Sequence, residues 1–427
     1  MMMEKKKGEF YGWKLVASLW VMYFFTTGMP LYAGAVIGTY MLRDIVMDRA
    51  TFGLGFTLLN MCVGGVGVLV SASITRWDVK KTMWIGCALL ALGQFGMAFV
   101  ASKPWHYLLG FGLLIGSGMC FGGTIASGTL CTRWFMRLRG SAIGIVLTAS
   151  GVAGFVCSPL FNKLLTITEG NWRLSWVVVG ATSILTAILV AIFVKERPEN
   201  LGQVPDGGQD DTVHNQDMKK KALHATYEWT PKEALRTHTF WLVFIAIVAC
   251  KVPFFFYTAH AILHAKGVGM SAANAALVMG VFTVGGVPGK LAGGWLMDRI
   301  AARYVFIMGL CCSIVGCFLQ ININKDHLLL ACIAGLLIGI GFGWTYSVAN
   351  ILPGHYFGHK AYVKLVGAFL TLASVVSAPI SMIGGMIYDM TKSYTISFWV
   401  CIGTCIVAII ALLFSPMPKP PKAKVAT

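Results

Sequence analysis

The sequence predicts an all-α membrane protein with twelve transmembrane helices, arranged as two pseudo-symmetric six-helix bundles. Of its 427 residues, 57% are hydrophobic and only 12% are charged, whereas about a quarter of the residues in a soluble domain are charged. The mean hydropathy is +0.73. The apolar residues gather in twelve runs long enough to span a bilayer, and the first six runs resemble the last six at a fixed offset.

The twelve runs also predict the orientation of the chain. They lie at residues 13–41, 51–75, 82–102, 106–132, 140–166, 173–195, 238–265, 272–298, 303–323, 327–352, 362–388 and 394–415. An even number of spans puts both termini on one side. That side carries 24 of the 34 Lys and Arg residues, against 8 on the other side and 2, Lys251 and Lys290, deep within the runs. The positive-inside rule therefore predicts a multi-pass protein of the cytoplasmic membrane with both termini in the cytoplasm.

A polar segment rich in Gly, Pro and charged residues separates the two sets of six runs. We expect five parts, which are a cytoplasmic N-terminus (1–12), an N-terminal bundle (13–195), a cytoplasmic linker loop (196–237), a C-terminal bundle (238–415) and a cytoplasmic tail (416–427).

An offset of about 223 residues relates the two bundles. At this offset Arg76 aligns with Arg299, and Gly144 aligns with Gly367. The pair at 134–135, Trp-Phe, meets the pair at 356–357, Tyr-Phe, to within one position. Matches that share one offset favour duplicated halves.

Composition excludes several classes of function. The net charge is +17, but the basic residues form short clusters between apolar runs, which is typical of an orientation signal and not of nucleic-acid binding. The 12 cysteines lie almost wholly inside apolar runs without paired spacing, so they predict neither disulfides nor a metal site. No catalytic triad, metal cluster or phosphate loop is present, so we expect no enzyme and no cofactor.

The eighth run carries a deep lysine, Lys290. It lies eight residues before Asp298, about 12 Å along a helix and about twice the reach of a lysine stem. Small residues share its helix face, namely Thr283, Gly286, Val287, Gly293 and Gly294. Such a face suits a cavity wall or a close helix contact, and an intramembrane cation predicts a substrate or ion site. The alternative is a lysine that snorkels to the cytoplasm.

The seventh run carries a second deep lysine, Lys251, about 20 Å from either end. Pro253 follows it and frees a backbone carbonyl, which is tolerated where a helix lines a cavity. Lys251 is therefore a second candidate cation, with a structural lysine as the alternative. His260 and His264 have i, i+4 spacing near the outer end of this run. We interpret them as interfacial residues and pH sensing as the alternative, because no further metal ligand is nearby.

Several segments resemble one transporter family. Residues 293–303, which read GGWLMDRIAAR, resemble the signature between helices eight and nine of the major facilitator superfamily. The copy in the first half is degraded, with Thr75 where the family has Asp. The segment RWF at 133–135 followed by RGSAIG at 139–144, with RPENLG at 197–202, is similar to bacterial monocarboxylate transporters and the oxalate/formate antiporter group.

This resemblance implies secondary transport of a small organic anion, a mono- or dicarboxylate, by alternating access. Lys290 stands where the family has an arginine that pairs with the substrate carboxylate; lysine keeps the charge but loses the two-donor fork. The resemblance also implies gating or structural roles for the motif residues, which are Asp298, Arg299, Arg303, Arg76, Arg133 and Arg139.

Polar and aromatic side chains complete the expected substrate site. Tyr346 stands where anion exchangers of this family carry a tyrosine, and Phe342 and Asn350 share its helix face. Tyr32, beside a Gly-Pro break in the first run, is a further candidate. For Asn350 and Tyr32 the alternative is helix packing or an interfacial position.

The coupling prediction depends on an absence from the sequence. No Asp or Glu falls within a run away from its ends. Proton-coupled relatives have an Asp where this chain has Gly286, and the oxalate exchanger has a lysine near Ala373. Two deep lysines leave the empty site positive, which disfavours reorientation until an anion binds. The sequence therefore favours exchange with a counter-anion over proton symport, in which Lys290 or His260 would carry the proton.

One alternative comes from a different class of protein, an anion sensor that binds its ligand without turnover. Such a sensor usually needs an appended signalling domain, and the largest polar segment here is the 196–237 loop. We expect a monomer in the lipid bilayer.

Overall fold

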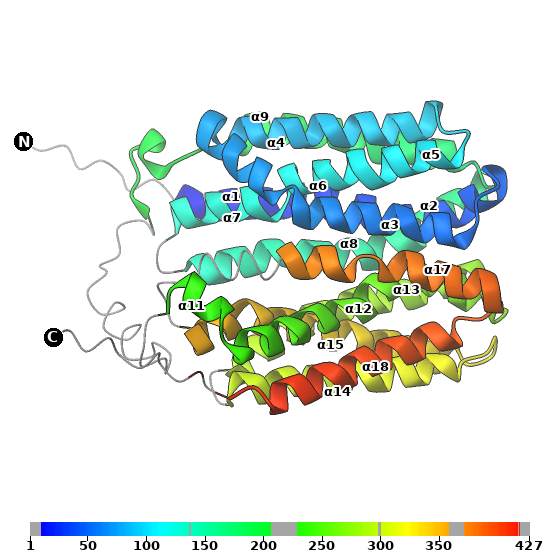
Figure 1. The fold of residues 1–427 in the computed structure, drawn as a ribbon. Helices are drawn as coiled ribbons and strands as arrows, with labels where there is room; N and C mark the ends of the chain where they lie inside the picture. The colour runs from blue at the N-terminus through cyan, green and yellow to red at the C-terminus, as the bar shows by residue number, and fades with distance from the viewer. Residues whose placement is uncertain are drawn as a thin grey trace, which may run out of the picture.

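The computed structural model describes residues 10–135, 138–205, 229–297, 300–357, 371–416 and 418. Within these ranges all regular structure is helical, and eleven helices are long and apolar enough to cross a membrane. The two ends of the described chain lie at the same end of the molecule, which we call the terminal end; the opposite end is the distal end (Figure 1). The predicted all-α membrane fold is confirmed.

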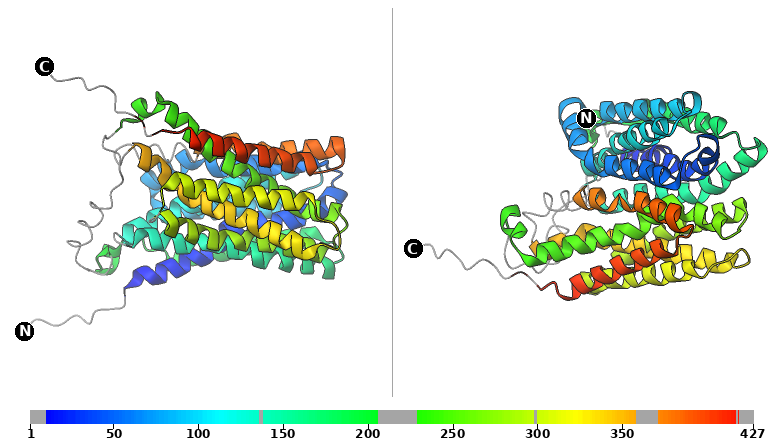
Figure 2. Two further views of the ribbon diagram at one scale, coloured as in Figure 1. Left: turned by 90° about the horizontal axis from the view of Figure 1, so that it is seen from below. Right: turned by 45° about the vertical axis from the view of Figure 1, so that its right-hand side comes forward.

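Two groups of helices lie one above the other (Figure 1; Figure 2, right). The first group contains α1 (Tyr11–Tyr23), the π-helix η1 (Phe24–Gly28), α2 (Met29–Asp44), α3 (Arg49–Gly65), α4 (Gly67–Phe99), α5 (Pro104–Tyr107), the π-helix η2 (Leu108–Ile115), α6 (Gly116–Gly122), α7 (Thr124–Trp134), α8 (Arg139–Ile167) and α9 (Trp172–Phe193). The second group contains α12 (His238–Gly267), α13 (Ala272–Met297), α14 (Ala302–Ile321), α15 (Leu328–Phe357), a helical stretch at 371–377, α17 (Ile380–Thr391) and α18 (Thr395–Leu413).

The second predicted span differs from the structure because it contains a break, whereas the turn between the second and third spans lies in the predicted gap. The second span is interrupted at Val66, so it consists of α3 and the first part of α4. The turn into the third span is so tight that α4 continues through it, with a single non-helical residue, Asp78, at φ 71°. Asp78 falls between the second and third predicted runs, 51–75 and 82–102, so the sequence places this turn correctly.

The polar linker carries short helices at its two described ends. These are η3 (Pro198–Leu201) and α11 (Pro231–Leu235), while residues 206–228 lie outside the described ranges. Thr230 and Glu233 form a reciprocal cap at the start of α11, and the hydrogen bonds from Thr230 lower the pKa of Glu233.

The hydrophobic core is shared at one end of the molecule and divided at the other. A large cluster joins residues of both groups, for example Phe52 and Trp176 with Phe256 and Tyr394. Two smaller clusters, at the terminal end, each draw on one group alone. The two groups are therefore packed together distally and have separate cores at the terminal end.

A pair of equivalent contacts supports the internal duplication. In the first group the indole of Trp134 donates to the Lys195 carbonyl at 2.9 Å, just beyond α9. In the second group the Tyr356 hydroxyl lies 2.9 Å from Ser415 Oγ, just beyond α18. Each half thus ties the end of its fourth span to the chain that leaves its sixth span.

Candidate functional site

The site begins with the close packing of α13 against α15. A Cβ atom built at Gly285, Gly289 or Gly293 would lie 2.8, 2.4 or 2.9 Å from a carbonyl oxygen of α15. Only glycine permits such an approach, so this four-residue repeat brings the two backbones into contact. This glycine repeat, which shares only Gly293 with the predicted small-residue face, sets Lys290 beside α15.

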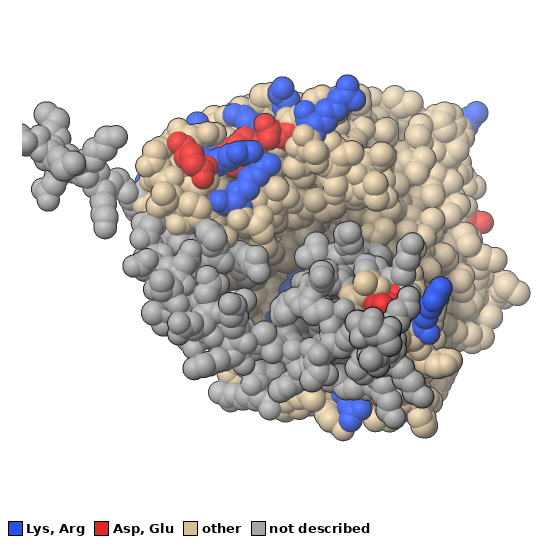
Figure 3. Space-filling model, turned by 60° about the vertical axis from the view of Figure 1, so that its left-hand side comes forward, with Lys and Arg blue, Asp and Glu red and all other residues tan. Residues whose placement is uncertain are grey.

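The two halves touch along α8 and α13 and then diverge. A Cβ at Gly154 would lie 2.4 Å from Thr283, and one at Gly151 would lie 2.8 Å from Val287. A Cβ at Gly144, two turns nearer the terminal end of α8, would meet no described residue within 4 Å. Viewed from the terminal end, the surface is hollowed between the halves, and Lys or Arg atoms are visible within the hollow (Figure 3).

Lys290 lies where this divergence starts. It follows Val287 by one helix turn and is half-buried. Its Nζ is 5.8 Å from the ring centroid of Tyr346, which lies about 16 Å of helix rise before the end of α15. Among the described residues no carboxylate is within ion-pair distance of it. This position does not support the snorkelling alternative, and it leaves the ammonium group available to an anion.

An aromatic row continues from Lys290 over two further helices, α15 and α12. The Phe342 ring is 5.6 Å from the Tyr346 ring on the same helix. Phe254 of α12 stacks on Phe342, with centroids 3.7 Å apart and an interplanar angle of 14°. The site thus consists of one cation, the Lys290 ammonium, at the end of a wall formed by the three aromatic rings. Sequence analysis had not singled out Phe254, because an aromatic residue in an apolar run carries no distinguishing signal.

Lys251 has a different environment. It is 6% exposed, and its Nζ donates to Ser374 Oγ at 2.7 Å. A Cβ at Gly64 of the other half would lie 2.7 Å from Ser374 Cβ, so this lysine lies near the seam between the halves. Ser374 was missed by sequence analysis, although the neighbouring Ala373 had been compared with the exchanger's lysine.

Two other predicted substrate contacts are only partly placed. Tyr32 is 4% exposed and belongs to the core cluster that both halves share. Asn350 lies on α15, but its side chain is outside the described part. Their roles remain predictions.

The histidines of α12 are not exposed interfacial residues, and that interpretation is corrected here. His260 is fully buried, with Nδ1 3.1 Å from the Tyr394 hydroxyl and Nε2 2.6 Å from the Ser381 carbonyl. His264 is 8% exposed and bonds to the Gln320 carbonyl. Their neighbours are aromatic rings and carbonyls of α17, α14 and the α17–α18 turn. Sequence spacing could not reveal this burial.

Only some of the residues of the predicted family motifs lie in the part of the chain that the structure describes. Arg133 pairs with Glu196 at 2.5 Å and lies 3.8 Å from Asp78, which ties three segments of the first half together at the terminal end. Arg76 is exposed, 5.2 Å from the ring of Trp77. Asp298, Arg299 and the side chain of Arg139 lie outside the described residues.

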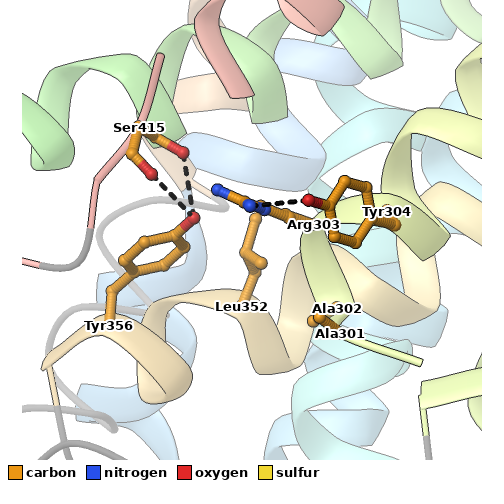
Figure 4. Close-up of a pocket in the computed structure, with 7 residues that line it drawn as sticks. All are labelled: Ala301, Ala302, Arg303, Tyr304, Leu352, Tyr356 and Ser415. Carbon is orange, nitrogen blue, oxygen red and sulfur yellow. Dashed lines mark hydrogen bonds between the residues drawn. The ribbon is translucent and has the colours of Figure 1, made fainter. Parts of the chain in front are cut away.

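Arg303 lines a separate cavity of about 280 Å³ at the terminal end (Figure 4). Its Nη2 donates to the Tyr304 hydroxyl at 2.7 Å, and Tyr356 with Ser415 forms the opposite wall. This cavity lies between α14, α15 and the tail, away from the aromatic row of Lys290.

Comparisons with known proteins agree on a family. The model of the Major Facilitator Superfamily matches residues 19–264 and 254–427. Monocarboxylate transporter 13 of Bos taurus is 27% identical over 77% of this chain and 71% of that protein. Monocarboxylate transporter 12 of Rattus norvegicus is 24% identical over 96% of this chain and 86% of that protein.

Solved structures share the fold at low sequence identity. A bacterial homologue of the human lysosomal transporter Spinster superposes with a TM-score of 0.70 at 16% identity, covering 95% of this chain and 96% of that one. The nucleoside transporter NupG superposes with a TM-score of 0.68 at 12% identity, covering 93% of this chain and 98% of that one.

Proposed function

Since the chain belongs to the major facilitator superfamily and is a transporter of small solutes, not an enzyme, we propose that its substrate is a small organic anion. The anion is a mono- or dicarboxylate that crosses the cytoplasmic membrane by alternating access. In this proposal the terminal end faces the cytoplasm, so the hollow between the halves opens inward (Figure 3).

The observation that carries the proposal is the position of Lys290. A cation inside a membrane bundle is costly unless something neutralises it. Lys290 is half-buried at the mouth of the contact between the halves, with an aromatic ring beside it and no carboxylate partner in the described part of the chain. A carboxylate on the substrate would supply the missing charge. Rocking of the halves about the α8–α13 contact would then expose the bound anion to either side.

Lys251 has a supporting role in this proposal. Its ammonium is turned to Ser374, near the seam, so it adds positive potential to the site and responds to movement between the halves. With two lysines and no deep carboxylate in the apolar runs, the empty carrier reorients poorly and the loaded carrier reorients readily. This asymmetry favours exchange of anions.

The rival mechanism is proton-coupled symport of a monocarboxylate, the substrate class that appears in the names of the relatives. In this symport mechanism either Lys290 or His260 would bind and release the coupled proton. His260 lies on α12 about 13 Å of helix rise from Lys251 towards the distal end, and both of its ring nitrogens have partners. These contacts favour Lys290 as the proton carrier if symport operates.

Uptake into proteoliposomes tests the proposal and separates the two mechanisms. Liposomes would be loaded with a candidate anion or left empty, and uptake of the labelled anion measured with and without an acid-outside pH gradient. Exchange predicts uptake that requires internal anion and ignores the gradient. Robust gradient-driven uptake into empty liposomes would refute exchange and support symport.

An anion sensor without turnover is the alternative of another class. It would bind anions, so ligands would raise the melting temperature of the purified protein, but no anion would accumulate in liposomes under either condition. Combining the thermal screen with the uptake assay therefore distinguishes sensor from carrier.

A further inference from the structure

The two halves meet at the distal end through the backbones of α3 and α17. A Cβ at Gly385 would lie 2.1 Å from the Arg49 carbonyl oxygen, and one at Gly53 would lie 2.1 Å from the Ser381 carbonyl oxygen. Such close approach is possible only while both positions are glycine and the halves are in direct contact. The amide of Ala50 also donates to Asp389 Oδ2 at 2.9 Å.

Arg49, the first residue of α3, reaches across this contact into the other half. Its guanidinium carbon lies 3.6 Å from the ring centroid of Tyr388 and 5.4 Å from that of Tyr394. Its Nη1 donates to the Tyr394 hydroxyl at 2.9 Å. Cation and ring at such distances attract each other, and the hydrogen bond fixes the direction of approach.

The receiving side is held rigidly by its own half. Tyr394 is 2% exposed, and its ring centroid lies 4.6 Å from that of Tyr388. Its hydroxyl accepts from Arg49 and lies 3.1 Å from Nδ1 of His260, whose Nε2 contacts the Ser381 carbonyl. The Tyr394 hydroxyl can therefore donate to His260 while it accepts from Arg49, so the two bonds support each other.

A second contact crosses in the opposite direction. Lys266, near the end of α12, donates from Nζ to Thr39 Oγ1 at 3.0 Å and lies 4.8 Å from the ring of Tyr40. Thr39 and Tyr40 belong to α2 of the first half. Each half thus places one cation against a tyrosine of the other.

We propose that these reciprocal contacts, Arg49 with Tyr388 and Tyr394, and Lys266 with Tyr40, form a latch that keeps the distal end closed. The inference rests on the proposed alternating access, because the distal end must open in each cycle. Tyrosine rings are neutral, so the separation of these rings from Arg49 and Lys266 returns each cation to water without breaking an ion pair. Asp389, whose Oδ2 accepts from the Ala50 amide across the contact, is already partly exposed to water. This makes the latch reversible, unlike a buried ion pair, whose partners both require compensation.

Hydrogen–deuterium exchange of the purified protein, without substrate, tests the latch. In Arg49→Gln, exchange in segments 49–57 and 380–391 should rise about fivefold, since two cation–ring contacts and one hydrogen bond are lost. Lys266→Gln should act in the same direction with a smaller effect. Lys325→Gln is the matched control, because Lys325 is an exposed cation at the same end that makes no contact across the halves among the described residues. Equal exchange in Arg49→Gln and Lys325→Gln would overturn the proposal.

A second variant guards against misfolding. If Arg49→Gln raises exchange along the whole chain, it has unfolded, and Tyr394→Phe then decides. It keeps the ring and removes the hydroxyl, which accepts from Arg49 across the halves and also bonds to His260 within its own half, so exchange in segment 49–57 of the other half reports the contact with Arg49. Faster exchange confined to the distal segments supports the latch, and unchanged exchange overturns it. Because the assay needs no substrate, absence of anion transport would reject the proposed function and leave this result standing.

Discussion

Lys251 and Lys290 lie on adjacent helices of the same half, and both sit deep in apolar runs, yet their surroundings differ. Lys251 is 6% exposed and donates to Ser374 at the seam with the other half. Lys290 is half-buried where the halves diverge, and its described neighbour is the face of Tyr346. A position deep in an apolar run therefore identifies a lysine as a candidate for function. The groups that surround its ammonium then indicate whether it binds the substrate or another residue of the protein.

Among the variants that test this difference between the two lysines, Lys290→Gln is expected to reduce transport most. Truncating one member of a desolvated charge pair costs about 3–5 kcal/mol, roughly a hundredfold or more in transport at low substrate. Uptake into proteoliposomes should therefore be abolished, while the melting temperature without substrate stays the same or rises. Lys290→Arg should retain part of the activity. Near-normal uptake by Lys290→Gln would remove this residue from the site.

Lys251→Met should have an intermediate effect. If Lys251 contributes potential and does not touch the anion, uptake falls about tenfold, as for a charge that acts at a distance through a medium of intermediate dielectric. Thermal stabilisation by the substrate should persist in Lys251→Met and vanish in Lys290→Gln, which separates binding from movement. A complete loss of ligand stabilisation in Lys251→Met would make the two lysines equivalent and break the comparison.

The sequence predicted the helices that carry this site better than it predicted which side chains contact one another there. Twelve apolar runs and the polar linker gave the helices, because spanning a bilayer imposes a length and a composition on each one. Lys290 and Tyr346 were predicted on separate runs, and the structure brings them together. Ser374 and Phe254 were missed, because a serine or a phenylalanine in an apolar run is ordinary, and only packing gives it a partner.

Burial was harder to predict than position. His260 and His264 lie towards the expected end of α12, but the sequence could not show that α17 and the 391–395 turn cover them. The split at Val66 was missed for a related reason, since apolar periodicity reports which residues avoid water and not where a helix breaks; the turn at Asp78, in contrast, lies between two predicted runs. Both errors concern tertiary contacts between segments far apart in the chain.

Ser374→Ala tests whether the ammonium of Lys251 is stabilised by a residue of the protein and not by the substrate. Removing an acceptor from a buried ammonium costs about 1–3 kcal/mol, so the melting temperature should fall and uptake should drop only a few-fold. Ser377→Ala is the matched control, because Ser377 is also buried, one helix turn away, and its hydroxyl bonds to the carbonyls of Val248 and Ala373. An equal loss of stability in both variants would show that Ser374 has no special relation to the lysine.

The smallest effect concerns the ring beside Lys290. A cation–ring contact contributes about 0.5–2 kcal/mol, and at 5.8 Å the lower part of this range applies. Tyr346→Leu should therefore raise KM about threefold, because no ring then holds the Lys290 ammonium in the position from which it binds the anion. Tyr346→Phe keeps the ring and should retain the wild-type KM, so this pair of variants separates the ring from the hydroxyl. If Tyr346→Phe were as impaired as Tyr346→Leu, the hydroxyl would be the group that matters, and Tyr346 would then act as a hydrogen-bond donor to the anion. Lys290 would in that case share the carboxylate with a second group, and its environment would differ from that of Lys251 through a polar contact and not through an aromatic one.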